Sequence, residues 1–397
     1  MKLASRITKI KPSPTMAMAA RAREMITRGI EIVNLGLGEP DFQTPEAACN
    51  AGIAAIQSGY TKYTPPSGAV DLKEVIRQKL KRDNGLDYNI NEIIISCGAK
   101  HSLYNIAQVL FEKGDEVIIP APYWVSYPDQ VLLSDATPII VNTKEENNFL
   151  MTPTQLKETI TPKTKAIILN SPSNPAGATY LEKHYEAFAE LLLSASLWII
   201  SDEIYEKFLY DGTSHTSIAS LSPELKNKTI VVNGISKAYA MTGWRIGYAA
   251  GPAEIIKAMG TVQGQSTSNP TSISQKAAVA ALKEGASFTQ TMLEQFDQRR
   301  QFMLEKLNRI PGIRCPRPTG SFYLFPNIQE ILGRKYKGVE ILGSVDLATF
   351  LLEEGGVTTI PGAAFGAENH LRISYAAPEK VLAQGLEKID HAIRLLS

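Results

Sequence analysis

Five short apolar runs in the middle of the chain constrain its fold more than any other feature. They are Ile93–Ser96, Val117–Pro120, Ala166–Leu169, Trp198–Ser201 and Thr229–Asn233. Each run is almost wholly apolar, as expected for a strand covered on both faces, and helical patterns separate several of them. The sequence therefore predicts an α/β fold with a mainly parallel sheet flanked by helices.

The texture of the sequence changes after about residue 290. A charged helix through Arg299 and Arg300 leads to short strands over Phe322–Phe325 and Leu371–Tyr375, with a helix over Asp346–Glu353 between them. A chain of 397 residues is too long for one ordinary core. We expect a large domain over residues 48–290 and a smaller α/β domain formed by residues 1–47 and 291–397.

Composition argues against several classes of protein. The 41 basic and 40 acidic residues nearly balance, so neither nucleic acid nor an anionic membrane is an expected partner. Three isolated cysteines form no CxxC pair, so we expect no disulfide framework and no structural metal site. The N-terminus lacks the long apolar core of a signal peptide, and a cytoplasmic location is expected.

Unusual side chains follow all five strands. In open α/β sheets, ligands bind beyond the carboxyl ends of the strands. The residues at these ends are Gly98-Ala99-Lys100, Trp124, Asn174, Asp202 with Tyr205, and Lys237. Each has a structural alternative: an ordinary strand–helix turn, a packed surface tryptophan, a turn cap, or a helix N-cap in the case of Asp202. Their recurrence at five strand ends indicates a ligand site.

Lys237 is the most informative of these residues, because a lysine that emerges from a buried strand is rarely a solvated surface charge. A desolvated or cation-flanked amine loses its proton near neutral pH and becomes able to form a Schiff base. Arg245, eight residues later, would lower the pKa of Lys237 by charge repulsion. Pyridoxal phosphate (PLP) uses a lysine, an acid, ring-oxygen donors, a stacking ring and an anion cradle together.

The segment Gly234–Gly247 resembles the Schiff-base signature of the class I/II aminotransferases, PLP enzymes of fold type I. The resemblance extends from Gly38-Glu39-Pro40-Asp41-Phe42 to Leu371-Arg372-Ile373-Ser374-Tyr375. It implies that Lys237 carries the cofactor and moves the α-proton of the substrate. It also implies that Asp202 keeps the pyridine nitrogen protonated, that Tyr205 and Asn174 donate to the ring hydroxyl oxygen, and that Trp124 stacks on the ring.

The same resemblance assigns the cofactor phosphate to one corner of the site. The backbone at Gly98-Ala99, with Lys100 nearby, would hold it together with Arg245 and Ser236. Many relatives have a serine three residues before the lysine, where this chain has Gly234. Tyr63 matches a tyrosine that reaches the phosphate from a neighbouring subunit, which implies a homodimer with shared active sites.

Arg372 matches the arginine that binds the substrate α-carboxylate in this family. Strand alternation would place Leu371, Ile373 and Tyr375 on one face and Arg372 on the other. A planar guanidinium binds carboxylates in bidentate fashion. The alternative is an arginine on a solvated strand face. Gly38, Trp124 and Asn174 are expected to contact the substrate too.

Lys100 bears on the choice of substrate. The Gly-Ala-Lys turn resembles that of bacterial aspartate aminotransferases, in which this lysine reads the distal carboxylate. Lys11-Pro12-Ser13 matches a segment near the substrate in the same group, and Lys11 is a position implicated in prephenate use; its alternative is a solvated charge. We expect L-aspartate and 2-oxoglutarate as substrates, giving oxaloacetate and L-glutamate, with prephenate as a second keto acid.

Competing hypotheses remain open at this stage. An aminotransferase for aromatic or other amino acids, or a PLP lyase of the same fold, would share most of these residues. A regulatory protein that senses PLP or an amino acid would be expected to carry a basic DNA-binding module as well, for which the chain has neither spare length nor charge. A nucleotide-binding protein is disfavoured, because no GxGxxG or GxxxxGK[ST] motif occurs at a strand–helix turn.

Overall fold

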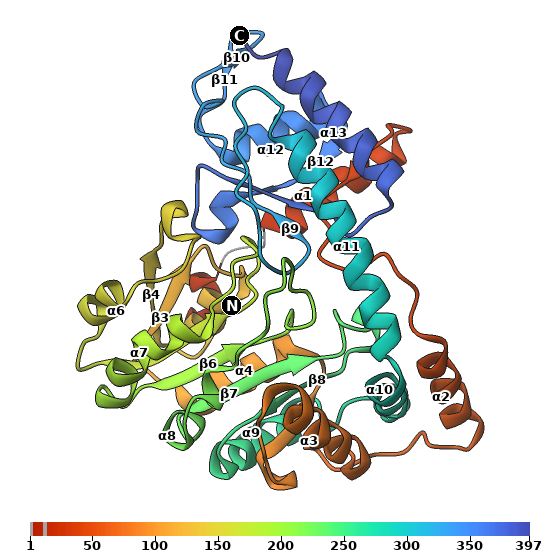
Figure 1. Cartoon of the computed structure of the whole chain (residues 1–397), viewed down its shortest axis with the longest axis vertical. Coiled ribbons are helices and arrows are strands. Elements are labelled where there is room, and N and C mark those ends of the chain that lie inside the picture. The colour runs from red at the N-terminus through yellow and green to blue at the C-terminus, as the bar shows by residue number, and fades with distance from the viewer. Residues whose placement is uncertain (1–2, 11–13) are drawn as a thin grey trace.

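The computed structural model of the chain describes residues 3–10 and 14–397 (Figure 1). Its main sheet has the strand order β2-β8-β7-β6-β5-β3-β4. The strands are β2 (Ile93–Ser96), β3 (Glu116–Ala121), β4 (Thr137–Asn142), β5 (Thr164–Asn170), β6 (Trp198–Asp202), β7 (Thr229–Gly234) and β8 (Gly247–Ala250). Only β8 runs antiparallel to its neighbours, β2 and β7. The predicted α/β fold with a mainly parallel sheet is confirmed.

Helices cover both faces of this sheet. They are α2 (Glu46–Gln57), α3 (Val70–Asn84), α4 (Ala99–Leu110), α5 (Ser126–Leu133), α6 (Pro153–Thr159), α7 (Glu182–Ser194), α8 (Pro223–Lys226), α9 (Ala253–Ser266) and α10 (Ser272–Glu284). Successive strand residues enter different cores: Ile93 and Ile95 pack with α3 and α10, whereas Ile94 packs with α4 and α9. Burial on both faces is why the strands read as unbroken apolar runs.

A second, smaller group of elements lies beyond the sheet, and the long helix α11 (Ala286–Leu307) extends from the sheet toward it (Figure 1). This group contains α1 (Pro14–Thr27), α12 (Ser344–Glu353), α13 (Glu379–Arg394), β1 (Val33–Asn34), β9 (Tyr323–Leu324), β10 (Lys335–Tyr336), β11 (Val339–Glu340), β12 (Val357–Thr358), β13 (Ile360–Pro361) and β14 (Leu371–Ser374). The N-terminal strand β1 pairs in parallel with β12, which joins the two ends of the chain. The exact domain boundaries, 48–290 against 1–47 and 291–397, stay a prediction.

Short 3₁₀ helices complete the fold: η1 (Ser5–Lys9), η2 (Ile90–Glu92), η3 (Glu145–Asn147), η4 (Ile218–Ser220), η5 (Thr242–Trp244) and η6 (Gly362–Phe365). Over residues 3–10 and 14–397, every helix is either too short or too polar to cross a lipid bilayer. The carboxyl ends of β5, β6 and β7 face the smaller group of elements, so the residues that follow these strands meet residues of β9 and β14 in a common cavity.

Candidate active site

A cavity of about 670 Å³ lies where the sheet meets the smaller group of elements. Most of the predicted site residues line it. They are Gly38, Ala99, Lys100, Trp124, Asn174, Asp202, Tyr205, Ser236, Lys237, Arg245 and Arg372. The fold therefore brings residues that lie up to 334 positions apart in the sequence, Gly38 and Arg372, to one place.

Asp202 is the last residue of β6 and its side chain is buried. Its Oδ2 atom accepts a 2.7 Å hydrogen bond from the Tyr127 hydroxyl, and its Oδ1 atom accepts one of 3.3 Å from the backbone N–H of Ile204. Burial raises the pKa of Asp202 to about 6, against the opposing effect of the Tyr127 hydrogen bond. The N-cap alternative is wrong, because a turn and not a helix follows this strand.

Lys237 follows the carboxyl end of β7, and its Nζ atom donates a 2.6 Å hydrogen bond to the carbonyl oxygen of Gly38. Burial lowers the pKa of Lys237 to about 8, and the charges of Arg372 and Arg245 act in the same direction while Glu39 opposes them. The sequence predicted that the charge of Arg245 lowers the pKa of Lys237, but burial is the larger cause of the lowering. Near neutral pH, a much larger fraction of this amine is therefore unprotonated than in an ordinary lysine.

An anion-binding corner forms where α4 begins. Its N-cap is Gly98, with a φ of 90°, a backbone conformation that favours glycine. A Cβ atom at Gly98 would overlap the guanidinium of Arg245, which donates to the carbonyl oxygens of Thr242 (2.8 Å) and Cys97 (3.2 Å). The free N–H groups of the helix start and this guanidinium together favour a bound phosphate.

Ser236 is buried and lines the cavity. Gly234, which replaces the serine of many relatives, is packed against β8: a Cβ atom there would lie 3.0 Å from both the Cα atom of Gly247 and the carbonyl oxygen of Ile246. This close approach of β7 and β8 leaves little room for a side chain at position 234. Polar contacts to a phosphate in this part of the site must therefore come from other residues.

Arg372 lies in β14 and is only 4% exposed, so the solvated-face alternative is wrong. Its Nη1 atom donates to Oδ1 of Asn174 at 3.0 Å, and Nη2 donates to the carbonyl oxygen of Gly36 at 2.8 Å. The guanidinium also lies 4.5 Å from the ring centroid of Tyr323. Within the described residues, its buried Nε atom has no hydrogen-bond partner, so this N–H and the second N–H of each Nη atom are left for a ligand.

Asn174 owes its orientation to a second asparagine. The side chain of Asn170 accepts a 2.8 Å hydrogen bond from the backbone N–H of Asn174, and its Nδ2 atom donates to the carbonyl oxygen of Asp202 at 3.0 Å. Asn170 therefore caps the turn, and the side chain of Asn174 is free to meet Arg372. The alternative in which Asn174 only caps the turn is wrong.

Residues 30–389 match the class I and II aminotransferase family. The chain belongs to this family. It is 49% identical to an aspartate aminotransferase from Geobacillus stearothermophilus and 46% identical to an aspartate/prephenate aminotransferase from Cereibacter sphaeroides, each over 98% of both chains. Its structure superposes on that of an aspartate aminotransferase from Rhizobium meliloti with a TM-score of 0.97, at 44% identity over the whole of both chains. The resemblance identified from the sequence is confirmed.

Two tyrosines of this aminotransferase site were missed by the sequence analysis. Tyr127 contacts Asp202, and the hydroxyl of Tyr323 lies 3.0 Å from that of Tyr205. Tyr127 falls one helical turn after Trp124, so helical spacing from a predicted site residue was a usable signal. Tyr323 lies in a predicted strand, where only its position opposite Ser374 of β14 distinguishes it from a core residue.

One predicted residue lies away from the cavity within this one chain. Tyr63 is 88% exposed and is absent from the described residues that line the cavity. Lys11 lies outside the described residues, so its role stays a prediction. Lys100 is present, with its Nζ atom 4.8 Å from the ring centroid of Trp124.

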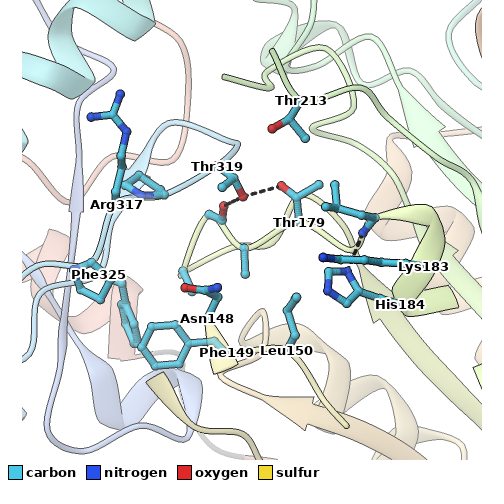
Figure 2. Close-up of a pocket in the computed structure, with 16 residues that line it drawn as sticks. Asn148, Phe149, Leu150, Thr179, Lys183, His184, Thr213, Arg317, Thr319 and Phe325 are labelled. Atoms are coloured by element: carbon cyan, nitrogen blue, oxygen red, sulfur yellow. Dashed lines mark hydrogen bonds between the residues drawn. The ribbon is translucent and has the colours of Figure 1, made fainter. Parts of the chain in front are cut away.

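The aminotransferase has a second, smaller cavity of about 200 Å³, shown in Figure 2. It lies between Asn148–Leu150, the start of α7 and the loop Pro316–Thr319. One wall is fixed by a 3.0 Å hydrogen bond from Thr319 to the hydroxyl oxygen of Thr179. Among the described residues that line it, none belongs to the predicted site.

Proposed function

We propose that this chain is a PLP-dependent aspartate aminotransferase, which transfers the amino group of L-aspartate to 2-oxoglutarate and yields oxaloacetate and L-glutamate. One observation carries the proposal: the amine of Lys237, with its lowered pKa, shares a cavity with the buried carboxylate of Asp202 and the buried guanidinium of Arg372. A nucleophilic amine, a carboxylate for a ring nitrogen and an anchor for an amino acid are the groups that transamination requires.

The residues present fit PLP. Burial raises the pKa of Asp202 more than Tyr127, Ile204 and Lys237 lower it, and a protonated ring nitrogen would supply further positive charge beside the carboxylate. We assign the Schiff-base bond to Lys237, the ring hydroxyl to Tyr205 and Asn174, the ring face to Trp124, and the phosphate to Gly98, Ala99, Lys100, Ser236 and Arg245. When bound, PLP supplies an electron sink for the bond to the α-hydrogen of the substrate.

The remaining work falls to side chains of the chain itself. Arg372 binds the α-carboxylate and so fixes the position of the α-carbon. The neutral amine of Lys237 then accepts the α-proton and returns it at a neighbouring atom. Because the amino group stays on the protein between the two half-reactions, ping-pong kinetics follow.

Lys100 supports the choice of aspartate. Its ammonium lies at the edge of the cavity over Trp124, where it is able to meet a distal carboxylate. All three relatives above carry aspartate in their names, and one of them is an aspartate/prephenate aminotransferase. We therefore include prephenate as a second keto acid, read in part by Lys11. The alternatives are an aminotransferase of aromatic or other amino acids and a PLP lyase of the same fold.

The exposure of Tyr63 supports a homodimer with shared active sites. Large apolar side chains of the same region are exposed in the single chain, namely Ile53, Ile56 and Val70. Exposed large apolar side chains are a feature of subunit interfaces. We propose that Tyr63 reaches the phosphate corner of the partner subunit, and that the dimer functions in the cytoplasm, where the three isolated cysteines stay reduced.

The test is product analysis with purified protein, PLP, aspartate and 2-oxoglutarate. Formation of glutamate and oxaloacetate supports transamination, whereas ammonia or pyruvate means elimination and absence of turnover would favour a sensing role. An absorbance spectrum that bleaches on addition of aspartate alone reports the first half-reaction. Faster turnover of phenylalanine than of aspartate would contradict the proposed substrate.

A further inference from the structure

The segment that follows β6 presents side chains in two directions. Asp202 and Tyr205 line the active-site cavity, whereas Glu203 and Glu206 are buried outside it, 1% and 7% exposed. Residues 204–207 form turns and not a regular helix. The backbone that carries two proposed cofactor contacts therefore depends on what holds the two glutamates on its other side.

Glu203 is held by three side chains. Its Oε1 atom accepts hydrogen bonds from the hydroxyls of Ser201 (2.9 Å) and Ser217 (2.6 Å). Its Oε2 atom lies 2.9 Å from Nε2 of His215, a residue that is itself almost fully buried. A carboxylate buried to this degree is retained only when donors or cations surround it.

Glu206 forms an ion pair with Lys79 of α3. Its Oε2 atom accepts a 2.8 Å hydrogen bond from Asn84, whose Oδ1 atom accepts one of 2.7 Å from Lys79. The same Oε2 atom lies 4.0 Å from Nε2 of His215. We call Lys79, Glu203, Glu206 and His215 the buried quartet. With His215 protonated, its two carboxylates and two cations balance.

Burial lowers the pKa of His215, but the carboxylates of Glu203 and Glu206 outweigh it, so the pKa lies above the ordinary value of 6.5. Despite burial, Lys79 and His215 lower the pKa of Glu206 to about 2. Further titratable groups on the surrounding elements are Asp83, Tyr88, Glu182, Tyr185, Glu186, Lys207, Tyr239 and Tyr248.

A bound metal ion explains these contacts less well than a proton. The ligand atoms of Glu203, Glu206 and His215 lie within 4.8 Å of one another, as a metal site would require. The ammonium of Lys79 already neutralises Glu206, however, and it would repel a divalent cation bound to the same carboxylate. A proton on His215 supplies the missing positive charge with no such repulsion.

We propose that protonated His215, together with Lys79, holds Glu203 and Glu206 in place and thereby positions Asp202 and Tyr205 for the cofactor. Among the described residues, His215 forms hydrogen bonds or ion pairs with Glu203 and Glu206 and with neither Asp202 nor Tyr205, so it acts as a positioning residue. The inference rests on the proposed function, since it names PLP as the group that Asp202 and Tyr205 bind. Its chemistry is that of a neutral, buried ion cluster whose balance depends on one proton.

His215→Gln tests the proton without using the cofactor. Glutamine keeps a donor at the position of Nε2 but carries no charge. Because the pKa of His215 is raised in the folded protein, its protonation stabilises the fold fully below pH 6.5. This stabilisation is lost as the pH rises through the folded-state pKa, and the folding equilibrium changes by up to about tenfold per pH unit. The difference in thermal unfolding midpoint between wild type and His215→Gln should therefore be largest at pH 6 and shrink toward pH 9. The exposed residue His391 supplies the control, His391→Gln; a constant difference for both variants overturns the role of the proton.

PLP titration, followed by absorbance at pH 7, tests the positioning role. His215→Gln should bind PLP roughly tenfold more weakly than wild type and His391→Gln, since the unbalanced carboxylates shift the turn. A less stable His215→Gln protein with unchanged PLP affinity overturns the positioning role alone. If the wild-type protein binds no PLP, the proposed function fails first, and the pH result still reports on the quartet.

Ser217→Ala keeps the proposal testable should His215→Gln fail to fold. This change removes only the 2.6 Å hydrogen bond to Glu203 and leaves His215 in place. It should weaken PLP binding about threefold while the pH dependence of the unfolding midpoint stays as in wild type. Unchanged PLP affinity would show that Glu203 does not position the turn.

Discussion

The hydroxyl of Tyr127 donates a 2.7 Å hydrogen bond to Oδ2 of Asp202, at the buried end of β6. Burial is the main cause that drives the pKa of Asp202 upward, and this hydrogen bond acts against it, with a net value of about 6. Asp202 is therefore mainly ionised at neutral pH and ready to pair with a protonated ring nitrogen. Its charge state depends on a residue that the strand-end pattern did not reveal.

Tyr127→Phe should make PLP binding more sensitive to acid. Without the hydroxyl, the pKa of Asp202 rises further, and the carboxylate is lost at a higher pH as the pH falls. A hydrogen bond to a charged group contributes about 1.5–3 kcal/mol, so the acid limb of PLP affinity should move up by roughly one to two pH units. PLP titrations from pH 5 to 8 measure it. Tyr375→Phe is the control, because that buried hydroxyl bonds the carbonyl oxygen of Ser321 instead; equal acid limbs in all three proteins would contradict the prediction.

Lys237→Ala should abolish transamination. The amine is assigned both the covalent link and the proton transfer, and loss of the proton transfer alone slows a reaction by about 10²–10⁴-fold. Lys237→Arg is the matched variant: it keeps a positive charge, but a guanidinium stays protonated and does not replace the amine. Both variants should be inactive in the glutamate assay. Native turnover by either one would remove Lys237 from the mechanism.

Gly98→Ala should weaken PLP binding by at least about tenfold. The φ of 90° strains an alanine there, by roughly 1–3 kcal/mol, and its methyl group would also displace the Arg245 guanidinium from the phosphate corner. Gly114→Ala separates these effects, because Gly114 also has a positive φ, 106°, but open space around it. The control should lower the unfolding midpoint and leave PLP affinity intact. Equal losses of affinity would mean that backbone strain, and not the corner, is responsible.

The strands were predictable because burial on both faces leaves an unbroken apolar signal. Ile93–Ser96 was located to the residue, and the other four runs to within two residues at either end. Two strands were harder to predict: β8 is short and rich in glycine and alanine, and the residues of β4 are partly exposed at the edge of the sheet. Strand direction was out of reach too, since the antiparallel pairing of β8 depends on the turn that carries Lys237 and Arg245.

The part of the site that lies at the strand ends was predictable. Parallel strands bring their carboxyl ends to one edge of a sheet, so Asp202, Asn174 and Lys237 were expected together. Contacts across the cavity were not predictable, because they depend on how β9 and β14 pack against the sheet. Burial of Arg372 follows from that packing, as does the contact between Tyr205 and Tyr323.

Lys100→Met should change substrate preference more than catalysis. Methionine keeps an unbranched side chain beside Trp124 but removes the ammonium, which lies over that ring and is assigned to the distal carboxylate of aspartate. Loss of a charged contact of about 1.5–3 kcal/mol lowers kcat/KM for aspartate by roughly 10- to 150-fold. With alanine as the amino donor, which has no distal carboxylate, kcat/KM should change less than about threefold. Steady-state kinetics with both donors measure the ratio. Arg372→Ala provides the contrast, because every amino acid has an α-carboxylate and both donors should lose kcat/KM together. Parallel losses in Lys100→Met would instead place Lys100 with the cofactor and leave aspartate recognition to another residue.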